Sequence, residues 1–145
     1  MPDSLPARIA HLEDAEAIRN LIASYGPLAD RGDAEGVARL WVADGEYDVG
    51  GHGVARGHAA IAALIDGATH RELMAAGCAH ILSPHRIALA GDRATAEGYS
   101  MVVRCTADGF EPWRVSANRW RFARQADGGW RITQRINRPI APRRP

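Results

Sequence analysis

The sequence predicts a single α+β domain in which helices cover one face of a curved antiparallel or mixed sheet. Helical periodicity is confined to the first half of the 145 residues, and alternating strand patterns fill the second half. Helices followed by an antiparallel meander are the order expected of this fold class. Three N-terminal helices laid across a curved sheet would leave a cone-shaped cavity between the layers, where a ligand could bind.

The first helix is expected to begin at Leu12. Apolar residues recur there at three- and four-residue steps, at Leu12, Ala15, Ile18, Leu21, Ile22 and Tyr25. The pair Gly26-Pro27 should break or kink this helix, because proline removes a backbone hydrogen bond and its ring clashes with the preceding turn. Asp33 is a good N-cap for a second helix at Ala34–Trp41.

The middle of the chain predicts a short strand and a third helix. Alternation at Glu46–Val49 favours the strand, and the glycine-rich segment Gly50–Gly53 favours a loop after it. The third helix is expected to open at Gly57 and to carry its apolar residues on one face. A further short turn should follow through Arg71–Ala76.

Four strand-like segments fill the rest of the chain. Short gaps that contain glycine separate them, which is a hairpin signal. The segments are Ala79–Ala90, Ala94–Cys105, Glu111–Arg124 and Trp130–Arg138. The whole pattern predicts an N-terminal arm at residues 1–10, one domain at residues 11–140 and a C-terminal tail at residues 141–145.

Composition excludes several function classes. The 18 basic residues, all arginine, balance 17 acidic ones, which argues against a nucleic-acid partner or an electrostatic role at a membrane. No apolar run approaches the roughly 20 residues that span a bilayer, and no signal peptide is visible. The absence of lysine excludes Schiff-base chemistry. Cys78 and Cys105 form no disulfide framework, so a reduced, cytoplasmic setting is expected.

The sequence predicts no cofactor and no metal. The glycine-rich run at residues 50–57 matches neither the dinucleotide-binding pattern nor the P-loop. The six histidines lack the His-Glu-x-x-His spacing, and neither cysteine pairs with another thiol as a zinc site requires.

Strand parity predicts a set of pocket residues. Four side chains of one strand share a face that mixes apolar walls with polar groups, namely Ser116, Asn118, Trp120 and Phe122. Asn118 could hydrogen-bond to a substrate, and Trp120 could form a wall of the pocket or belong to the core. Trp41 and Tyr47 could line the mouth of the cavity, although core packing is the ordinary role of such residues.

Two arginines on the last strand are further candidates. Arg135 or Arg138 could bind a carboxylate, a phosphate or an enolate of the substrate. A surface salt bridge is nevertheless the expected role of each.

Several residues follow the order and spacing of a known group of proteins: Tyr25, Asp30–Asp33, Trp41, Asp44-Gly45, Gly57, His80, the run Gly128–Ile132 and Arg135. In these residues, and in its order of elements, the chain resembles the SnoaL-like family of the nuclear-transport-factor-like superfamily. The resemblance covers about residues 12–140 and implies a cone-shaped α+β fold. The superfamily includes polyketide cyclases, ketosteroid isomerases, dehydratases and the small subunits of ring-hydroxylating dioxygenases.

The resemblance is nearest to scytalone-dehydratase-like and bile-acid-dehydratase-like enzymes. Those enzymes use an aspartate of the first helical segment that faces a histidine on a strand. Asp30 and His80 match these two residues by position, and Tyr25 matches a tyrosine. The resemblance therefore implies that these three residues are catalytic. Ketosteroid isomerases use a protonated aspartate on the sheet, and the interior of the last three strands here contains no aspartate.

These residues could carry acid–base chemistry. His80 could take a proton from a carbon acid and return one to a leaving hydroxyl, while Asp30 orients its ring. Tyr25 could donate a hydrogen bond to the substrate carbonyl. Alternatively, Asp30 bonds to nearby backbone, His80 is a satisfied core histidine and Tyr25 fills the core. On an unbroken helix, residues five apart point about 140° apart, so the bend at Gly26-Pro27 matters.

The resulting hypothesis is a cofactor-independent lyase or isomerase, above all a dehydratase that acts on a cyclic or polycyclic hydroxy-ketone. The expected partner is thus a small hydrophobic cyclic substrate. The alternatives are a polyketide cyclase, a ketosteroid-isomerase-like enzyme and a non-catalytic ligand-binding or assembly module. In the last case Asp30 and His80 would not face each other, and the cavity would be small or plugged. The convex side of the sheet carries enough apolar residues to predict a homodimer or homotrimer.

Overall fold

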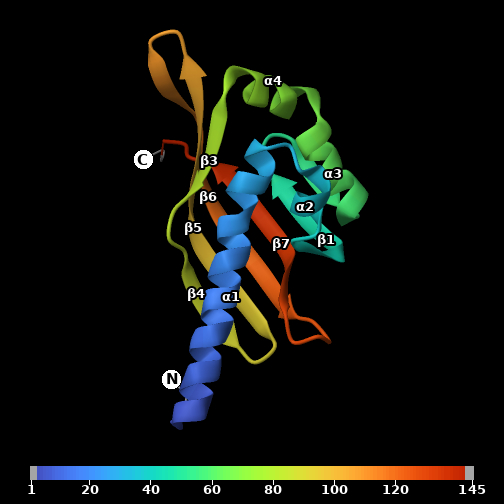
Figure 1. Cartoon of the computed structure of the whole chain (residues 1–145), viewed down its shortest axis with the longest axis vertical. Helices are drawn as coiled ribbons and strands as arrows, with labels where there is room; N and C mark the ends of the chain where they lie inside the picture. The colour runs from blue at the N-terminus through green and yellow to red at the C-terminus, as the bar shows by residue number, and fades with distance from the viewer. Residues whose placement is uncertain (1–2, 143–145) are drawn as a thin grey trace.

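The computed structural model describes residues 3–142 (Figure 1). Within that range the chain forms four helices and seven strands. They are α1 (Leu5–Asp30), α2 (Ala34–Ala38), β1 (Trp41–Val49), β2 (Gly53–Arg56), α3 (Gly57–Asp66), α4 (Ala68–Ala76), β3 (Cys78–Leu82), β4 (Arg86–Ala90), β5 (Arg93–Thr106), β6 (Gly109–Arg124) and β7 (Trp130–Pro139).

All seven strands belong to one mixed sheet. Its order is β2-β1-β7-β6-β5-β3, and β4 also pairs with β5. β1 runs parallel to β7, whereas the other neighbours are antiparallel. Helix α1 lies across one face of the twisted sheet, and α2, α3 and α4 gather near the C-terminal end of α1 (Figure 1). The predicted α+β class, with helices on one face of a curved mixed sheet, is confirmed.

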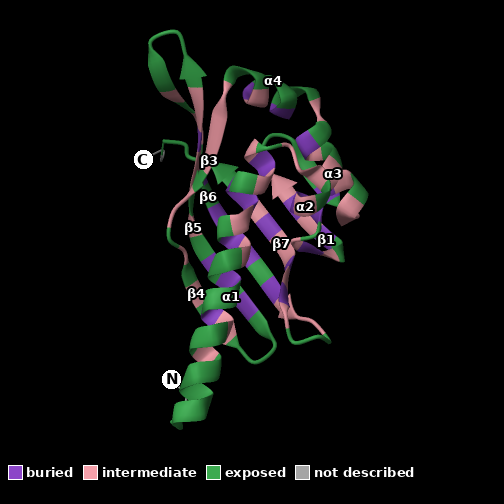
Figure 2. Ribbon diagram, in the orientation of Figure 1, coloured by how far each residue is buried: buried purple, intermediate pink, exposed green. Residues whose placement is uncertain are grey.

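Helix α1 corrects two expectations. It begins at Leu5 rather than Leu12, because Ser4 caps it and a proline occupies its first turn. Residues 5–10 of the expected N-terminal arm are thus helical, and they are exposed (Figure 2). The expected break at Gly26-Pro27 is also absent, since α1 continues through Pro27 to Asp30. The side chain of Pro27 is exposed, so its ring meets no packed neighbour on the core side.

Several other helices and strands begin or end at residues that differ from those expected from the sequence. The second helix ends at Ala38, so that Trp41 opens β1, and the expected turn after α3 is a full helix, α4. The expected loop at Gly50–Gly53 ends in a short strand, β2, which pairs with β1. The segment Ala79–Ala90 divides into β3 and β4 around Pro84, which has no backbone donor for a ladder. The structure therefore has four helices between residues 3 and 142, rather than three.

The core lies between α1, α3 and the sheet. Its largest fully buried apolar side chains are Ile18, Val37, Trp41, Ile61, Trp120, Phe122 and Ile132. The alternation predicted for β6 is confirmed, because its even-numbered residues from Ser116 to Phe122 are buried and the intervening ones are exposed or half-buried. This alternation directs polar as well as apolar side chains toward the helices.

A polar anchor fixes α1 across the sheet. The guanidinium of Arg124 donates to both carboxylate oxygens of Asp14, at 2.9 and 2.7 Å, and the indole of Trp130 donates to the same carboxylate at 2.9 Å. Hydrogen bonding from Arg124 lowers the pKa of Asp14. The anchor joins the middle of α1 to the β6–β7 hairpin, and thereby sets where the C-terminal end of α1 meets the sheet.

Three expectations concern the exterior of the molecule. None of the helices within residues 3–142 is long and apolar enough to cross a lipid bilayer. The outer side of the sheet exposes Ile81, Tyr99 and Val115, and the homodimer or homotrimer stays a prediction. Of the expected C-terminal tail, residues 141 and 142 have no regular structure, and residues 143–145 lie outside the described range.

Candidate functional site

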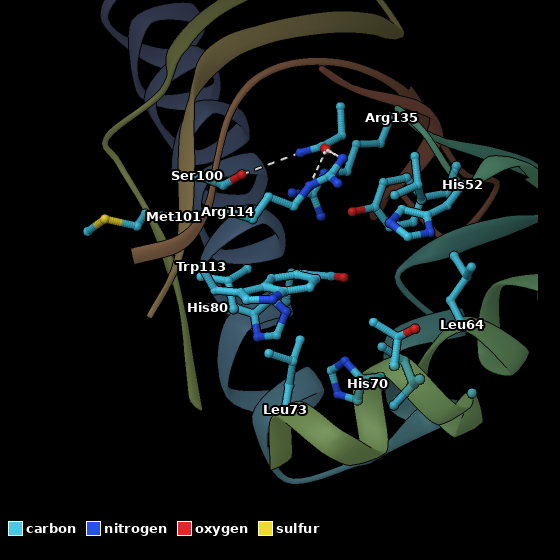
Figure 3. Close-up of a pocket in the computed structure, with 18 of the residues that line it drawn as sticks. His52, Leu64, His70, Leu73, His80, Ser100, Met101, Trp113, Arg114 and Arg135 are labelled. Carbon is cyan, nitrogen blue, oxygen red and sulfur yellow. Dashed lines mark hydrogen bonds between the residues drawn. The ribbon is translucent and has the colours of Figure 1, made fainter. Parts of the chain in front are cut away.

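A cavity of about 330 Å³ lies between the helices and the concave face of the sheet. Its volume is near the lower end of the range usual for small-molecule sites, roughly 300–1,000 Å³. His70, Leu73 and His80 lie at one end of the view in Figure 3, and Ser100, Arg114 and Arg135 lie at the other. The cavity therefore has a histidine end, with His70, Leu73 and His80, and an arginine end, with Ser100, Arg114 and Arg135.

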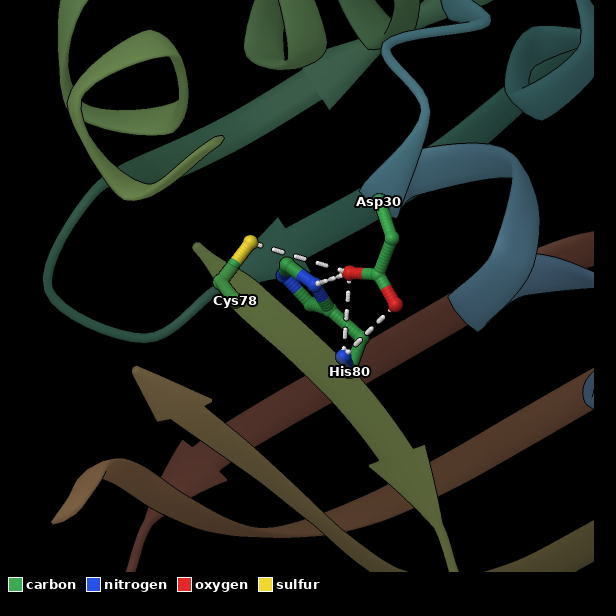
Figure 4. A group of neighbouring side chains, drawn as sticks. All are labelled: Asp30, Cys78 and His80. Atoms are coloured by element: carbon green, nitrogen blue, oxygen red, sulfur yellow. Dashed lines mark hydrogen bonds and ion pairs between the residues drawn. The ribbon is translucent and has the colours of Figure 1, made fainter. Parts of the chain in front are cut away.

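The histidine end contains a carboxylate–imidazole pair. Nδ1 of His80 lies 2.7 Å from Oδ1 of Asp30, and the backbone N–H of His80 donates to both carboxylate oxygens at 3.0 and 3.1 Å (Figure 4). Because an ionised carboxylate only accepts, Nδ1 carries the proton and Nε2 keeps its lone pair. His80 lines the cavity, whereas Asp30 lies behind it. The aspartate thus bonds to backbone and also orients the imidazole.

Gly26 allows α1 and β3 to approach each other this closely. A Cβ atom built at Gly26 would overlap the carbonyl oxygen of His80. Gly26 and Asp30 are four residues apart and share a helix face, so β3 crosses α1 beside both. Tyr25 flanks the same crossing, with its ring centroid 5.9 Å from that of His80. Tyr25 and Asp30 thus meet one histidine on a helix that continues through Pro27 without a break.

Burial sets the protonation of the site. Burial lowers the pKa of His80 below its ordinary 6.5, although the neighbouring Asp30 acts in the opposite direction. The imidazole is therefore neutral at pH 7 and can accept a proton at Nε2. Burial also raises the pKa of Tyr25 far above its ordinary 10, and the nearby Tyr47 adds to this effect. Tyr25 lines the cavity with its phenol protonated, which makes it a hydrogen-bond donor.

Arg135 occupies an unusual position at the arginine end. It is 2% exposed, and its guanidinium carbon lies 4.4 Å from the ring centre of Tyr25, 4.7 Å from that of Tyr47 and 4.3 Å from that of Trp120. The expectation of a surface salt bridge is therefore wrong for Arg135. For Arg138 it is confirmed, because Nη2 lies 2.7 Å from Asp48 at the surface.

Three predicted pocket residues lie behind the cavity wall. The structure does not place Asn118, Trp120 or Trp41 among the residues that line the cavity, whereas Tyr47 lines it. Trp120 is fully buried, and Trp41 stacks on Tyr47 at a centroid distance of 5.4 Å. Asn118 accepts a hydrogen bond from Nε of Arg135 at 2.9 Å. Asn118 therefore supports Arg135, which lines the cavity, rather than lining the cavity itself.

Several lining residues were not predicted from the sequence. His70 is 7% exposed, its Nε2 donates to the Ala29 carbonyl oxygen at 2.7 Å, and its ring centroid lies 5.3 Å from that of His80. Its three-residue spacing from Leu73, on the buried face of α4, was the available signal. Arg114 has the same parity as Ser116 and Asn118, so the alternation of β6 could have indicated it.

One group of side chains has a donor set that suits a cation. Ligating atoms of Asp30, Cys78 and His80 lie within 4.8 Å of one another. The Cys78 thiol donates to Asp30 at 3.8 Å, and burial together with the Asp30 carboxylate raises the pKa of Cys78 to about 11. The thiol is thus protonated at neutral pH and adds a further donor to the carboxylate. The expectation that the protein uses no metal stays a prediction.

Comparison with known proteins places this architecture in a family. The SnoaL-like domain family matches residues 10–136. A crystal structure of a protein from Novosphingobium aromaticivorans, described as NTF2-like with a cystatin-like fold, is 55% identical, with a TM-score of 0.91, and the match covers 97% of this chain and 92% of that one. A function-unknown protein from Mycobacterium tuberculosis is 27% identical, with a TM-score of 0.81 and coverage of 93% and 76%.

A more distant structure shares the fold alone. The hexachlorocyclohexane dehydrochlorinase LinA-type3 from Novosphingobium barchaimii is 18% identical, with a TM-score of 0.79, and the match covers 92% of this chain and 91% of that one. None of the curated proteins matches the sequence. The SnoaL-like match extends from the first helix to the last strand and agrees with the fold and with the resemblance noted in the sequence. The chain belongs to the SnoaL-like domain family.

Proposed function

We propose that the protein is a cofactor-independent lyase, a dehydratase that removes water from a cyclic hydroxy-ketone. The observation that carries the proposal is the neutral imidazole of His80 at the cavity wall, held through Nδ1 by Asp30 at 2.7 Å. A base with one nitrogen fixed by a carboxylate and the other open to a cavity is the arrangement that general-base catalysis needs.

The proposed reaction is an elimination across two carbon atoms. Nε2 of His80 removes the proton on the carbon next to the ketone, and the electrons of that C–H bond form an enolate. Tyr25 donates a hydrogen bond to the enolate oxygen. The enolate then forms the C=C bond and expels the hydroxyl group from the β-carbon, which leaves as water with the proton from His80. The products are an enone and water, and no electron acceptor is needed.

Asp30 has two functions in this scheme. It fixes the tautomer in which Nδ1 carries the proton, so that the lone pair of Nε2 points away from α1. It also stabilises the imidazolium that exists between the two proton transfers. Because its carboxylate accepts the backbone N–H of His80 as well, it holds β3 in register with the end of α1.

The alternatives are a non-catalytic module, an isomerase and a cyclase, and the geometry of the site separates the first from the other two. A non-catalytic module predicted a cavity that is small or plugged and an aspartate that does not face the histidine. The hydrogen bond between Asp30 and His80 disagrees with the second expectation, and the cavity of about 330 Å³ is open rather than plugged, though near the lower end of the usual range. Isomerisation and cyclisation begin with the same proton abstraction and differ only after the enolate has formed. The dehydrochlorinase LinA-type3 is an eliminating enzyme by name, and at 18% identity it supports only the capacity of this fold to house such chemistry.

The test uses a panel of mono- and polycyclic β-hydroxy-ketones and follows the absorbance of the enone product. His80→Ala should lower the turnover of any substrate in the panel by about 10²- to 10⁴-fold, the usual value of a general base. Asp30→Asn should lower turnover by a comparable factor, because it no longer fixes the tautomer. The wild-type rate should fall on acidification, as His80 becomes protonated below pH 6.5.

Matched controls separate chemistry from folding. Asp33→Asn keeps the N-cap of α2, and His58→Gln keeps a donor to the Trp41 carbonyl oxygen, so both should retain the wild-type rate. The proposal fails if Asp30→Asn and His80→Ala leave turnover intact. Exchange of the α-proton with D₂O, without enone formation, would instead favour the isomerase or cyclase alternatives.

A further inference from the structure

We infer that the natural ligand carries a carboxylate group, which the arginine end of the cavity binds between Arg114 and Arg135. The inference specifies the substrate class of the proposed dehydratase. It rests on that proposed function in one respect, the identity of the part of the ligand that reacts. It narrows the expected hydrophobic cyclic substrate to a cyclic acid.

Arg135 is a buried cation that forms no ion pair with any carboxylate among residues 3–142. Its Nε donates to the amide oxygen of Asn118, and its Nη1 is buried without a hydrogen-bond partner among residues 3–142. No described aspartate or glutamate lines the cavity. A buried charge normally pairs with an opposite charge, because its desolvation is otherwise uncompensated. The three aromatic rings around Arg135 compensate only in part.

Arg114 brings a second positive charge to the same end. Its Nη2 donates to the Asn137 side-chain oxygen at 2.7 Å and to the Gly50 carbonyl oxygen at 2.8 Å. It forms no ion pair with any carboxylate in the described part of the chain, although it lines the cavity. Burial lowers its pKa, and the neighbouring Arg135 lowers it further. Two like charges thus line the same end of the cavity, where an anionic group of a ligand would pair with both.

Neutral amides hold the two arginines in place. Oδ1 of Asn118 accepts from Arg135 and also from Nδ2 of Asn137, at 3.0 Å, while Oδ1 of Asn137 accepts from Arg114. Both amides therefore present oxygen to a guanidinium without adding negative charge. This network fixes the side chains and leaves the net charge of the arginine end unpaired.

Ser100 adds a third donor. Its oxygen accepts from Nδ2 of Asn118 at 2.8 Å and from Nδ2 of Asn137 at 3.4 Å. Both of these contacts use the lone pairs of the hydroxyl, so its proton is free to be donated. Ser100 lines the cavity together with the two arginines. A carboxylate is the planar anion that matches two guanidinium groups and one hydroxyl donor.

The ligand would then span the cavity. Tyr25 contacts both ends, with Arg135 over its ring and His80 at its edge. A carboxylate at Arg135 would place the ring system of the ligand along the apolar wall formed by Leu64, Leu73 and Leu82, with its ketone near Tyr25. A cavity of about 330 Å³ suits a monocyclic or bicyclic acid.

The test compares acids with their isosteric amides, so it needs no knowledge of the substrate. Calorimetry at pH 7.5 would measure binding of benzoate, cyclohexanecarboxylate and 2-naphthoate beside benzamide, cyclohexanecarboxamide and 2-naphthamide. At least one acid should bind about tenfold more tightly than its amide, because charge-assisted hydrogen bonds exceed neutral ones. Arg114→Gln should remove most of that preference, and Arg138→Gln, at the surface, should leave it unchanged.

The outcomes are distinct from those of the turnover experiment. Absence of an acid preference in all three pairs, or a preference that Arg114→Gln leaves unchanged, would overturn the inference. Asp30→Asn and His80→Ala should keep the preference for acids over amides, whatever their effect on affinity, because neither residue belongs to the arginine end. If the two variants lose turnover while the wild type prefers no acid, the proposed dehydratase function is supported and the proposed carboxylate of the ligand is refuted. If the wild type prefers acids while Asp30→Asn and His80→Ala keep turnover, the carboxylate of the ligand is supported and the dehydratase function is refuted.

Discussion

The two ends of the cavity treat charge in opposite ways. At the histidine end the charged group is the Asp30 carboxylate, which accepts hydrogen bonds from the side chain and the backbone N–H of His80 and from the thiol of Cys78. At the arginine end, Arg114 and Arg135 receive only neutral oxygen atoms from amides and backbone. The charged group of the histidine end is thus satisfied by donors of the protein itself, whereas Nη1 of Arg135 at the arginine end has no hydrogen-bond partner among residues 3–142.

This difference indicates that the two ends of the cavity have different functions. The histidine end offers one hydrogen-bond acceptor to the cavity, the lone pair on Nε2 of His80, and this acceptor suits proton transfer. The arginine end has several free donors and uncompensated positive charge, which suits binding. The two ends also differ in origin, since Asp30 and His80 lie 50 residues apart on α1 and β3, whereas the arginine end comes entirely from three adjacent strands, β5, β6 and β7.

The largest effect expected from a single added methyl group is at Gly26, where α1 and β3 touch. Gly26→Ala would place Cβ against the His80 carbonyl oxygen, so the strand must move away from the helix. Turnover should fall by about 10²-fold or more, because displacements of about 1 Å at a reacting group have this effect. Acid binding at the arginine end should change little. Equal loss at both ends, measured by the two assays, would contradict the separation described above.

Pro27→Ala is the matched control for that substitution. It changes the next residue of the same helix, on the exposed side, and restores a backbone donor. It should raise the free energy of unfolding by about 1–3 kcal/mol, since proline is roughly 3 kcal/mol less favourable than alanine within a helix. Turnover should stay at the wild-type rate. Chemical denaturation measures the stability, and a decrease would show that Pro27 is needed for the end of α1.

A smaller effect should follow from giving the arginine end its own counter-charge. Asn118→Asp would place a carboxylate 2.9 Å from Nε of Arg135, in the position of the present amide oxygen. The acid preference should then fall by about tenfold, because the internal carboxylate competes with that of the ligand. Asn118→Leu serves as a comparison, since it removes the support without adding charge. An unchanged preference in Asn118→Asp would show that Arg135 does not bind the acid.

Much of the histidine end could be predicted from the sequence, and little of the arginine end. Asp30, His80 and Tyr25 fall in family register, and their residue types specify proton chemistry. Their approach could not be predicted, because it depends on Gly26 rather than on the expected bend at Pro27. Arg135 was a candidate for binding a carboxylate, a phosphate or an enolate, but its burial could not be predicted, because it depends on the packing of three aromatic rings around the guanidinium.

Local pattern and long-range packing also explain the remaining differences. The inward face of β6 followed from alternation, which is a property of one strand. The cavity contact of His70 and the supporting role of Asn118 depend on neighbours far apart in sequence, on α1 and β7. Helix α4 was underestimated because no side-chain cap marks its start, which falls directly after Gly67.

The most direct test of the account is the tautomer and titration of His80, measured by ¹⁵N NMR of histidine-labelled protein. We expect a neutral His80 ring at pH 7, with the proton on Nδ1, and a pKa below 6.5. Asp30→Asn should disturb this tautomer, and Asp33→Asn should leave it unchanged. A ring protonated on Nε2, or an imidazolium at pH 7, would contradict the claim that His80 is the base.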